Sequence, residues 1–210
     1  MIRNKLFLSL SSCRFGAVMP TMVGVMLFAL IFTIFLAGPA LSARAAPKEL
    51  PQFTLPAPVT EQERNYLGLK NTGTFQVGHI KPGVVILEFF DLGCPYCGSA
   101  TSDVDEVFRR IEGRPDLKGR VTMIGIGMSN DENKVKTYKT TYRVPFPVFP
   151  DTDTVISRLL NVKTTPTFVA VNVDGQGSAT VIYLKEGVFE SPARFLGDVI
   201  DASGLPGARP

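Results

Sequence analysis

The chain has 210 residues, a length that suits one domain behind a targeting segment. Its formal net charge of +3 misleads, because residues 1–45 contain four of the 22 Lys and Arg residues and no acidic residue. The other 18 basic residues are matched by 19 acidic ones, so the sequence offers no basic surface for phosphates. We therefore expect no nucleic-acid partner.

The first element is an apolar segment near the N-terminus. Residues 17–41 carry no charge, and three basic residues precede them. The run is long enough to span a bilayer, but Ala43-Arg44-Ala45 has the small-x-small pattern of a signal-peptidase site. Residues 1–45 are therefore predicted to be either a cleaved signal peptide or a membrane anchor. In both cases the basic end stays in the cytoplasm and residues 46–210 are exported.

The exported part begins with proline-rich sequence. Residues 46–58 contain four prolines and are predicted to be an extended linker that ends in a short strand over residues 52–55. A short helix or turn is expected over residues 60–70. A weakly alternating strand is expected over residues 74–80.

The central elements are easier to recognise. Short apolar runs of β-branched and aromatic residues, bounded by turn residues, predict buried strands at residues 84–90, 121–128 and 167–173. A turn at residues 174–177 leads into a last strand over residues 179–184. Periodic apolar positions, and prolines suited to a first helical turn, predict helices. These helices span residues 95–112, 130–142 and 152–161, and a closing helix begins at Ser191-Pro192.

The order of these elements predicts the fold class. Strands and helices alternate in the first half of residues 59–203, which indicates parallel βαβ units, and a hairpin then adds an antiparallel edge. The predicted fold is an α/β three-layer α/β/α sandwich around a central mixed sheet. Residues 204–210 are expected to be a C-terminal tail.

Cys94-Pro95-Tyr96-Cys97 is the motif that carries chemistry. It stands where the buried strand over residues 84–90 hands over to a helix. The unpaired N–H groups and the positive dipole end of a helix N-terminus stabilise a thiolate, and only a thiolate attacks disulfides. Cys94 is therefore the expected nucleophile, and Cys97, one turn further on, would resolve the mixed disulfide. Cys13 lies in the predicted targeting segment and is expected to be discarded or passive.

Other uses of two cysteines fit the sequence less well. Structural zinc needs two more N or S ligands, and a second Cys-x-x-Cys or a His-x-x-x-His pair is absent. A haem attachment site requires His after the second cysteine, where this chain has Gly98. A copper-binding role, in which soft thiolates hold the metal, stays open as an alternative. The sequence predicts no cofactor and no resident metal.

Two segments resemble thioredoxin-fold proteins. One is the strand over residues 84–90 followed by Cys94-Pro95-Tyr96-Cys97, and the other is residues 162–171 around Thr165-Pro166. The export signal, and a Cys97-to-Pro166 separation longer than in plain thioredoxin, make the chain similar to the TlpA/ResA-like extracytoplasmic thioredoxins. The resemblance covers roughly residues 50–203.

The resemblance implies roles for residues outside the cysteine motif. It implies that Pro166 is cis and packs beside the cysteines, and that Thr165 offers backbone hydrogen bonds to a substrate chain. Tyr96, together with Phe90, is expected to form an apolar docking rim, although either could instead pack internally. His79, the only histidine, is expected to lie exposed on a loop.

Glu88 falls where thioredoxin and DsbA keep a buried acid behind the second cysteine. All its neighbours in the strand are apolar, so its carboxyl should have a raised pKa and could relay the proton of Cys97. The alternative is a solvent-facing position at the strand edge. The chain also departs from the family, since Gly93 replaces the usual aromatic residue and Ala100 replaces the acid of ResA-type reductases.

Together these features predict an extracytoplasmic thiol–disulfide oxidoreductase, more a reductase than an oxidase. Its partners would be exported proteins with thiols or disulfides, and a membrane protein would supply electrons. The alternatives are a periplasmic oxidase or isomerase of Dsb type, a copper metallochaperone, and a thiol peroxidase. A peroxidase would want Thr or Ser three residues before Cys94, where this chain has Asp91.

Overall fold

The computed structural model describes residues 48–70 and 72–205. The predictions for residues 1–45, including the apolar segment 17–41, and for most of the tail 204–210 lie outside this part of the chain. Among the described residues, no helix has both the length and the apolar character that crossing a membrane requires.

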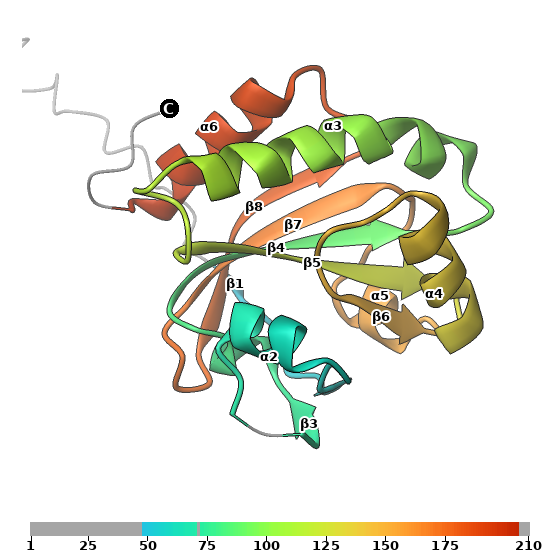
Figure 1. Ribbon diagram of the computed structural model, residues 1–210, viewed down its shortest axis with the longest axis horizontal. Coiled ribbons are helices and arrows are strands. Elements are labelled where there is room, and N and C mark those ends of the chain that lie inside the picture. Colours follow the sequence, from blue (N-terminus) through green and yellow to red (C-terminus); the bar gives the residue numbers. More distant parts are fainter. Residues whose placement is uncertain (1–47, 71, 206–210) are drawn as a thin grey trace, which may run out of the picture. The chain divides into compact units, whose positions relative to one another are not determined.

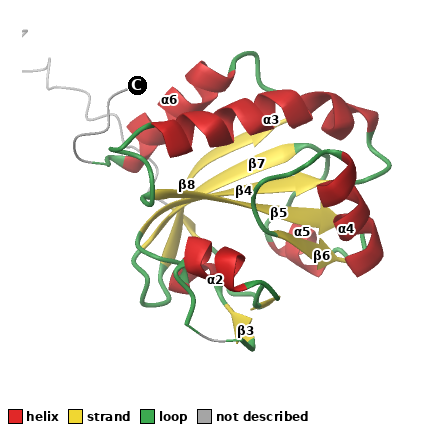
Figure 2. Ribbon diagram, in the orientation of Figure 1, coloured by secondary structure: helices red, strands yellow, loops and turns green. Residues whose placement is uncertain are grey.

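A mixed six-stranded sheet forms the centre of the domain (Figure 2). Its strand order is β1-β8-β7-β4-β5-β6. β4, β5 and β6 run parallel to one another, while β7 pairs antiparallel with β4, β8 with β7 and β1 with β8. The strands are β1 (Lys48–Glu49), β4 (Gly83–Phe90), β5 (Val121–Met128), β6 (Val148–Asp151), β7 (Thr167–Val173) and β8 (Ala179–Glu186).

Helices cover both faces of this sheet, as Figure 1 shows. α3 and α6 lie on one face, and α2 and α5 lie on the other. The helices are α2 (Glu61–Leu67), α3 (Pro95–Gly113), α4 (Glu132–Thr141), α5 (Val155–Leu159) and α6 (Pro192–Ser203). The predicted α/β sandwich with a central mixed sheet is confirmed for the described residues.

β4 is the central strand because its side chains are apolar on both faces. Val84 and Ile86 belong to the core beneath α3 and α6, whereas Val85 and Leu87 belong to the core on the opposite face. A strand buried on both faces reads as a continuous apolar run, which is the pattern that predicted it. Its carboxyl end therefore emerges from the middle of the sheet, directly before α3.

The short N-terminal elements differ from the prediction. The linker contributes β1 to the large sheet, and the strand expected at residues 52–55 is observed as β2 (Leu55–Pro56). The strand expected over residues 74–80 shortens to β3 (Thr74–Phe75), which pairs with β2, and a 3₁₀ turn, Val77–His79, follows it. That turn meets the β7–β8 connection closely, because Gly177 N–H donates to Gly78 O at 3.1 Å.

Candidate active site

The cysteine motif begins α3 at the carboxyl end of β4. Cys94 is the N-cap residue, and Pro95 occupies the first helical turn, where a missing N–H costs nothing. The backbone N–H of Cys94 donates to Asp91 O at 3.0 Å, and that of Cys97 donates to Cys94 O at 3.1 Å. The Cys94 sulfur is thus held beside the unpaired N–H groups of the helix N-terminus.

The two thiols occupy different environments. Both are free; Cys94 is partly exposed, while Cys97 is fully buried. Burial opposes ionisation of Cys94, but hydrogen bonds from the Thr165 side chain and from Cys97 outweigh it, so the pKa of Cys94 is lowered. Burial raises the pKa of Cys97 to about 12. Cys94 is therefore the thiol that can react with an external disulfide at neutral pH.

The segment around Pro166 lies against this thiol, although 71 residues separate Cys94 from Thr165. The Thr165–Pro166 peptide bond is cis, which confirms the prediction. The Cys94 Sγ–H donates to Thr165 O at 3.3 Å. The carbonyl of the next residue, Pro166 O, accepts a 2.8 Å hydrogen bond from Gly187 N–H, after the end of β8.

Glu88 is buried beneath the motif with 1% of its surface exposed, so the alternative of a solvent-facing edge position is wrong. Tyr138 Oη–H donates to Glu88 Oε1 at 3.4 Å, while Oε2 has no hydrogen-bond partner among the described residues. Burial raises the pKa of Glu88 to about 7, against the opposite effect of the Tyr138 hydrogen bond. A cavity of about 10 Å³, roughly the room for one water molecule, adjoins Glu88, Thr101 and Tyr142.

Of the two residues expected to form a docking rim, only Tyr96 is exposed, with 68% of its surface accessible. Phe90 is fully buried and stacks on Tyr138, with 3.8 Å between the ring centroids, so its place in a rim was wrong. β4 is covered on both faces, which leaves its last residue no path to the surface. His79 lies exposed, as predicted.

Sequence reasoning missed the aromatic stack behind the motif. Tyr138 packs between Phe90 and Tyr142, and its centroid lies 4.9 Å from that of Tyr142. The Tyr142 hydroxyl in turn reaches the first turn of α3, where a Cβ on Gly98 would lie 2.6 Å from it. Gly98 is therefore required for the helix to approach this stack.

Replacing Gly98 by alanine should destabilise the protein by about 1–3 kcal/mol, because the added methyl overpacks the site. Urea unfolding followed by circular dichroism measures this. The matched control is Gly113→Ala at the end of the same helix, where a Cβ meets nothing within 4 Å. Adding Tyr142→Phe should recover part of the loss. Equal stability of the two glycine variants would contradict the close approach.

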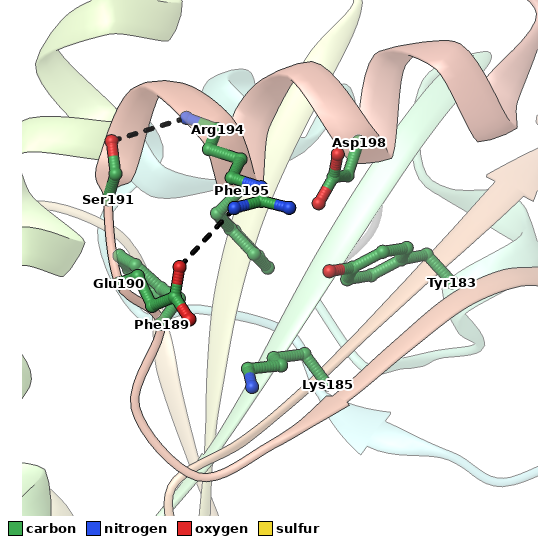
Figure 3. A pocket seen from close by; sticks show the side chains of 8 residues that line it. All are labelled: Tyr183, Lys185, Phe189, Glu190, Ser191, Arg194, Phe195 and Asp198. Carbon is green, nitrogen blue, oxygen red and sulfur yellow. Dashed lines mark hydrogen bonds and ion pairs between the residues drawn. The ribbon is translucent and has the colours of Figure 1, made fainter.

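A second hollow lies between β8 and α6. It has a volume of about 180 Å³ and, as Figure 3 shows, Tyr183 and Lys185 of β8 face Arg194 and Asp198 of α6 across it. Arg194 pairs with Glu190 at 3.3 Å. The hollow is lined by side chains of both charges, and the lining places no nucleophile beside a base that could activate it. This hollow is therefore no candidate for the chemistry.

Metal-ligating residues do not gather elsewhere. Within residues 48–70 and 72–205 there is no group of three or more His, Cys, Asp or Glu side chains placed to hold a metal ion. The copper-binding alternative would thus depend on Cys94 and Cys97 for its soft ligands within this part of the chain.

Comparison with known proteins identifies the domain. Residues 83–177 match the family model described as thioredoxin-like, and they span the motif, Glu88 and the cis-proline segment. The chain contains a thioredoxin-like domain. With Cys94 and Cys97 at its active-site turn, this thioredoxin-like domain is a thiol–disulfide oxidoreductase.

Solved structures share the fold. A thiol:disulfide interchange protein of the thioredoxin family from Chlorobium tepidum is 25% identical, with a TM-score of 0.54 over 77% of this chain and 100% of that one. A second Chlorobium tepidum protein, assigned as the interchange protein DsbE, is 17% identical with a TM-score of 0.55, covering 75% and 97%. StoA from Bacillus subtilis is 14% identical with a TM-score of 0.51, covering 72% and 98%. No curated protein sequence matches the chain.

Proposed function

We propose that this protein works outside the cytoplasm as a dithiol–disulfide exchanger that reduces disulfides in exported proteins. The proposal rests on the Cys94 thiol, which lies partly exposed at the start of α3 and donates a hydrogen bond to Thr165 O at 3.3 Å. Cys97 is buried behind it. This arrangement gives one accessible nucleophile and one protected resolving thiol.

The exchange takes two steps. The Cys94 thiolate attacks one sulfur of a substrate disulfide, so a Cys94–substrate bond forms, the substrate S–S bond breaks and the other substrate sulfur leaves as a thiolate. Cys97 then loses its proton and attacks the Cys94 sulfur, which forms the Cys94–Cys97 disulfide and releases the second substrate thiolate. The substrate gains two electrons and the protein dithiol loses them; both substrate thiolates take protons from water.

Glu88 is the proposed acceptor of the Cys97 proton. Its pKa of about 7 allows it to be ionised in part of the molecules at neutral pH, and to return a proton afterwards. Tyr138 lies near both groups: burial raises its pKa most, and the charges of Glu88 and Cys97 raise it further. The Tyr138 hydroxyl donates to Glu88 Oε1, which holds the carboxyl beneath the motif.

Substrate docking is proposed at the surface around Cys94. Tyr96, the residue before the buried Cys97, projects into solvent, and the exposed Val188 follows Gly187, whose N–H donates to Pro166 O. When Cys94 reacts, its hydrogen bond to Thr165 O is broken. A substrate segment in extended conformation then hydrogen-bonds to the backbone of Thr165. The binding surface would then combine apolar contact with backbone pairing.

The proposed location rests on the N-terminal sequence, with the basic residues ahead of the apolar segment 17–41. The structural neighbours from Chlorobium tepidum are named as thiol:disulfide interchange proteins, which agrees with exchange as the activity. A reductase in an oxidising compartment needs a supply of electrons. We therefore include a membrane protein as its electron donor.

A redox titration tests the direction of the exchange. The full chain carrying Cys13→Ala, in mild detergent, is equilibrated in glutathione and dithiothreitol buffers. Its free thiols are counted by mass-tag labelling, because the chain has no Trp for fluorescence. For a reductase we expect a potential at or below about −250 mV. A value above about −180 mV would instead support a Dsb-type oxidase or isomerase. If no Cys94–Cys97 disulfide forms in any buffer, exchange is wrong and copper binding by the dithiol becomes the next experiment.

A further inference from the structure

Asn130 is a fully buried polar residue at the turn after β5, where the sequence predicted only the start of a polar helix. Its neighbour Ser129 has a positive φ of 58°, and the next residue, Asp131, caps α4. This turn directs the Asn130 side chain toward the active-site loop. A buried amide must find partners for its oxygen and both its hydrogens, and those partners explain its position.

The amide group of Asn130 binds the loop that leads into the cysteine motif. Its Oδ1 accepts a hydrogen bond from Leu92 N–H at 2.9 Å. Its Nδ2 donates to Asp91 Oδ1 at 2.9 Å and to Met128 O at 3.1 Å. Two of these hydrogen bonds thus reach the loop after β4, and the third anchors the amide to the end of its own neighbouring strand, β5.

Asp91 extends this connection to the cysteines. Its Oδ1 also accepts from Gly93 N–H at 2.9 Å, and its backbone carbonyl accepts from Cys94 N–H at 3.0 Å. Burial raises the pKa of the Cys97 thiol, and the nearby backbone of Asp91 acts in the opposite direction. Asp91 therefore connects Asn130 to the first residue of the cysteine motif.

We propose that Asn130 is a positioning residue for the dithiol: by fixing Asp91 and Leu92 it holds in place the loop whose Asp91 carbonyl accepts the Cys94 N–H at the start of α3. This inference rests on the proposed exchange at Cys94 and Cys97. The Asp91 backbone in this loop also favours the thiolate that Cys97 must become before it attacks the Cys94 sulfur, because it lowers the pKa of Cys97 against the larger effect of burial. Asn130 thus supports the resolving step more than the first attack.

The two steps can be followed separately with 5,5′-dithiobis(2-nitrobenzoate). Attack by Cys94 releases one thionitrobenzoate and leaves the other bound to Cys94 as a mixed disulfide. Attack by Cys97 then forms the Cys94–Cys97 disulfide and releases the second. The full chain carrying Cys13→Ala, reduced and freed of reductant, should therefore show two phases of colour in stopped flow, because only Cys94 and Cys97 are then left to react.

For Asn130→Ala we expect the second phase to slow about tenfold, the factor that one hydrogen bond to a charged group is worth, while the first phase changes less. The control is Asn133→Ala, an exposed residue on the adjoining helix. If wild type shows both phases and Asn130→Ala matches it, the inference is wrong although the exchange stands. If the protein with both active-site cysteines releases only one thionitrobenzoate per chain, the proposed exchange is wrong and the inference falls with it.

A reciprocal exchange of side chains separates positioning from a merely structural role. Asn130→Asp places two carboxylates against each other and should slow the second phase. Adding Asp91→Asn restores one amide facing one carboxylate, and should bring the rate back to within about threefold of wild type. Failure of the double variant to recover, in protein whose circular dichroism matches wild type, would overturn the inference. This arm also decides the matter if Asn130→Ala fails to fold.

Discussion

The Cys97→Ala variant should accumulate as a mixed disulfide with its substrate, and the Cys94→Ala variant should lose almost all of its reactivity. Cys94 is the partly exposed thiol with the lowered pKa, whereas Cys97 is buried and can only act on the sulfur beside it. Loss of the nucleophile should lower the exchange rate by about three orders of magnitude or more. Loss of the resolving thiol should leave the first attack and stop the second.

Insulin, or an unfolded exported protein with one disulfide, serves as the substrate, and non-reducing gel electrophoresis with mass spectrometry detects the adduct. The adduct should lie on Cys94 and disappear on addition of dithiothreitol. An adduct on Cys97 in the Cys94→Ala variant, formed as fast as the Cys94 adduct, would reverse the assigned roles.

Replacing Glu88 by glutamine should make the protein more stable at pH 8 and leave its stability at pH 4 nearly unchanged. Burial raises the pKa of Glu88 from 4.5 to about 7. Between these values the folded chain keeps a proton that the unfolded chain has lost. The contribution of this group to the free energy of unfolding is therefore largest below pH 4.5, and it is lost as the pH rises through 7.

The size of this effect follows from the shift, since one pKa unit corresponds to about 1.4 kcal/mol. At pH 8 we expect Glu88→Gln to exceed wild type by about 3 kcal/mol in urea unfolding. Glu186→Gln, at an exposed glutamate on β8, is the control and should follow wild type at both pH values. If Glu88→Gln also follows wild type at both, the carboxyl is not desolvated in the folded protein.

The same variant should be a slower enzyme. Without a carboxylate to take the Cys97 proton, the resolving step at neutral pH should slow by about a hundredfold, the usual worth of a positioned base. The first attack by Cys94 needs no such base and should change little. A gain in stability together with this loss of rate would show that the buried acid is kept for the reaction and at the expense of the fold.

Much of the architecture could be read from local sequence. β4, β5 and β7 are apolar runs bounded by turns, and their observed limits match the predicted ones within one residue. Burial of Glu88 followed from its apolar neighbours in β4. The cis geometry before Pro166 came from resemblance, because sequence alone says only that an X-Pro bond can be cis.

The short elements could not be read in this way. β1, β2 and β3 have two residues each, too few for any alternation to appear. They are strands only because partners from elsewhere in the chain pair with them. The prediction that Phe90 lies in a docking rim was wrong for a related reason. A strand buried on both faces contains no pattern that separates a buried residue from an exposed one.

The sequence by itself determined the long strands β4, β5 and β7, the helix that presents Cys94, and the two thiols three positions apart. Only the tertiary structure decided what surrounds those thiols. Tyr138 and Asn130 stand in polar sequence that predicts a solvated helix, yet α4 folds against the ends of β4 and β5 and buries both. They reach Glu88 and Leu92 across 50 and 38 residues of chain. Hydrogen bonds between residues so far apart produce no periodic pattern in the sequence. They could therefore be recognised only in the folded structure.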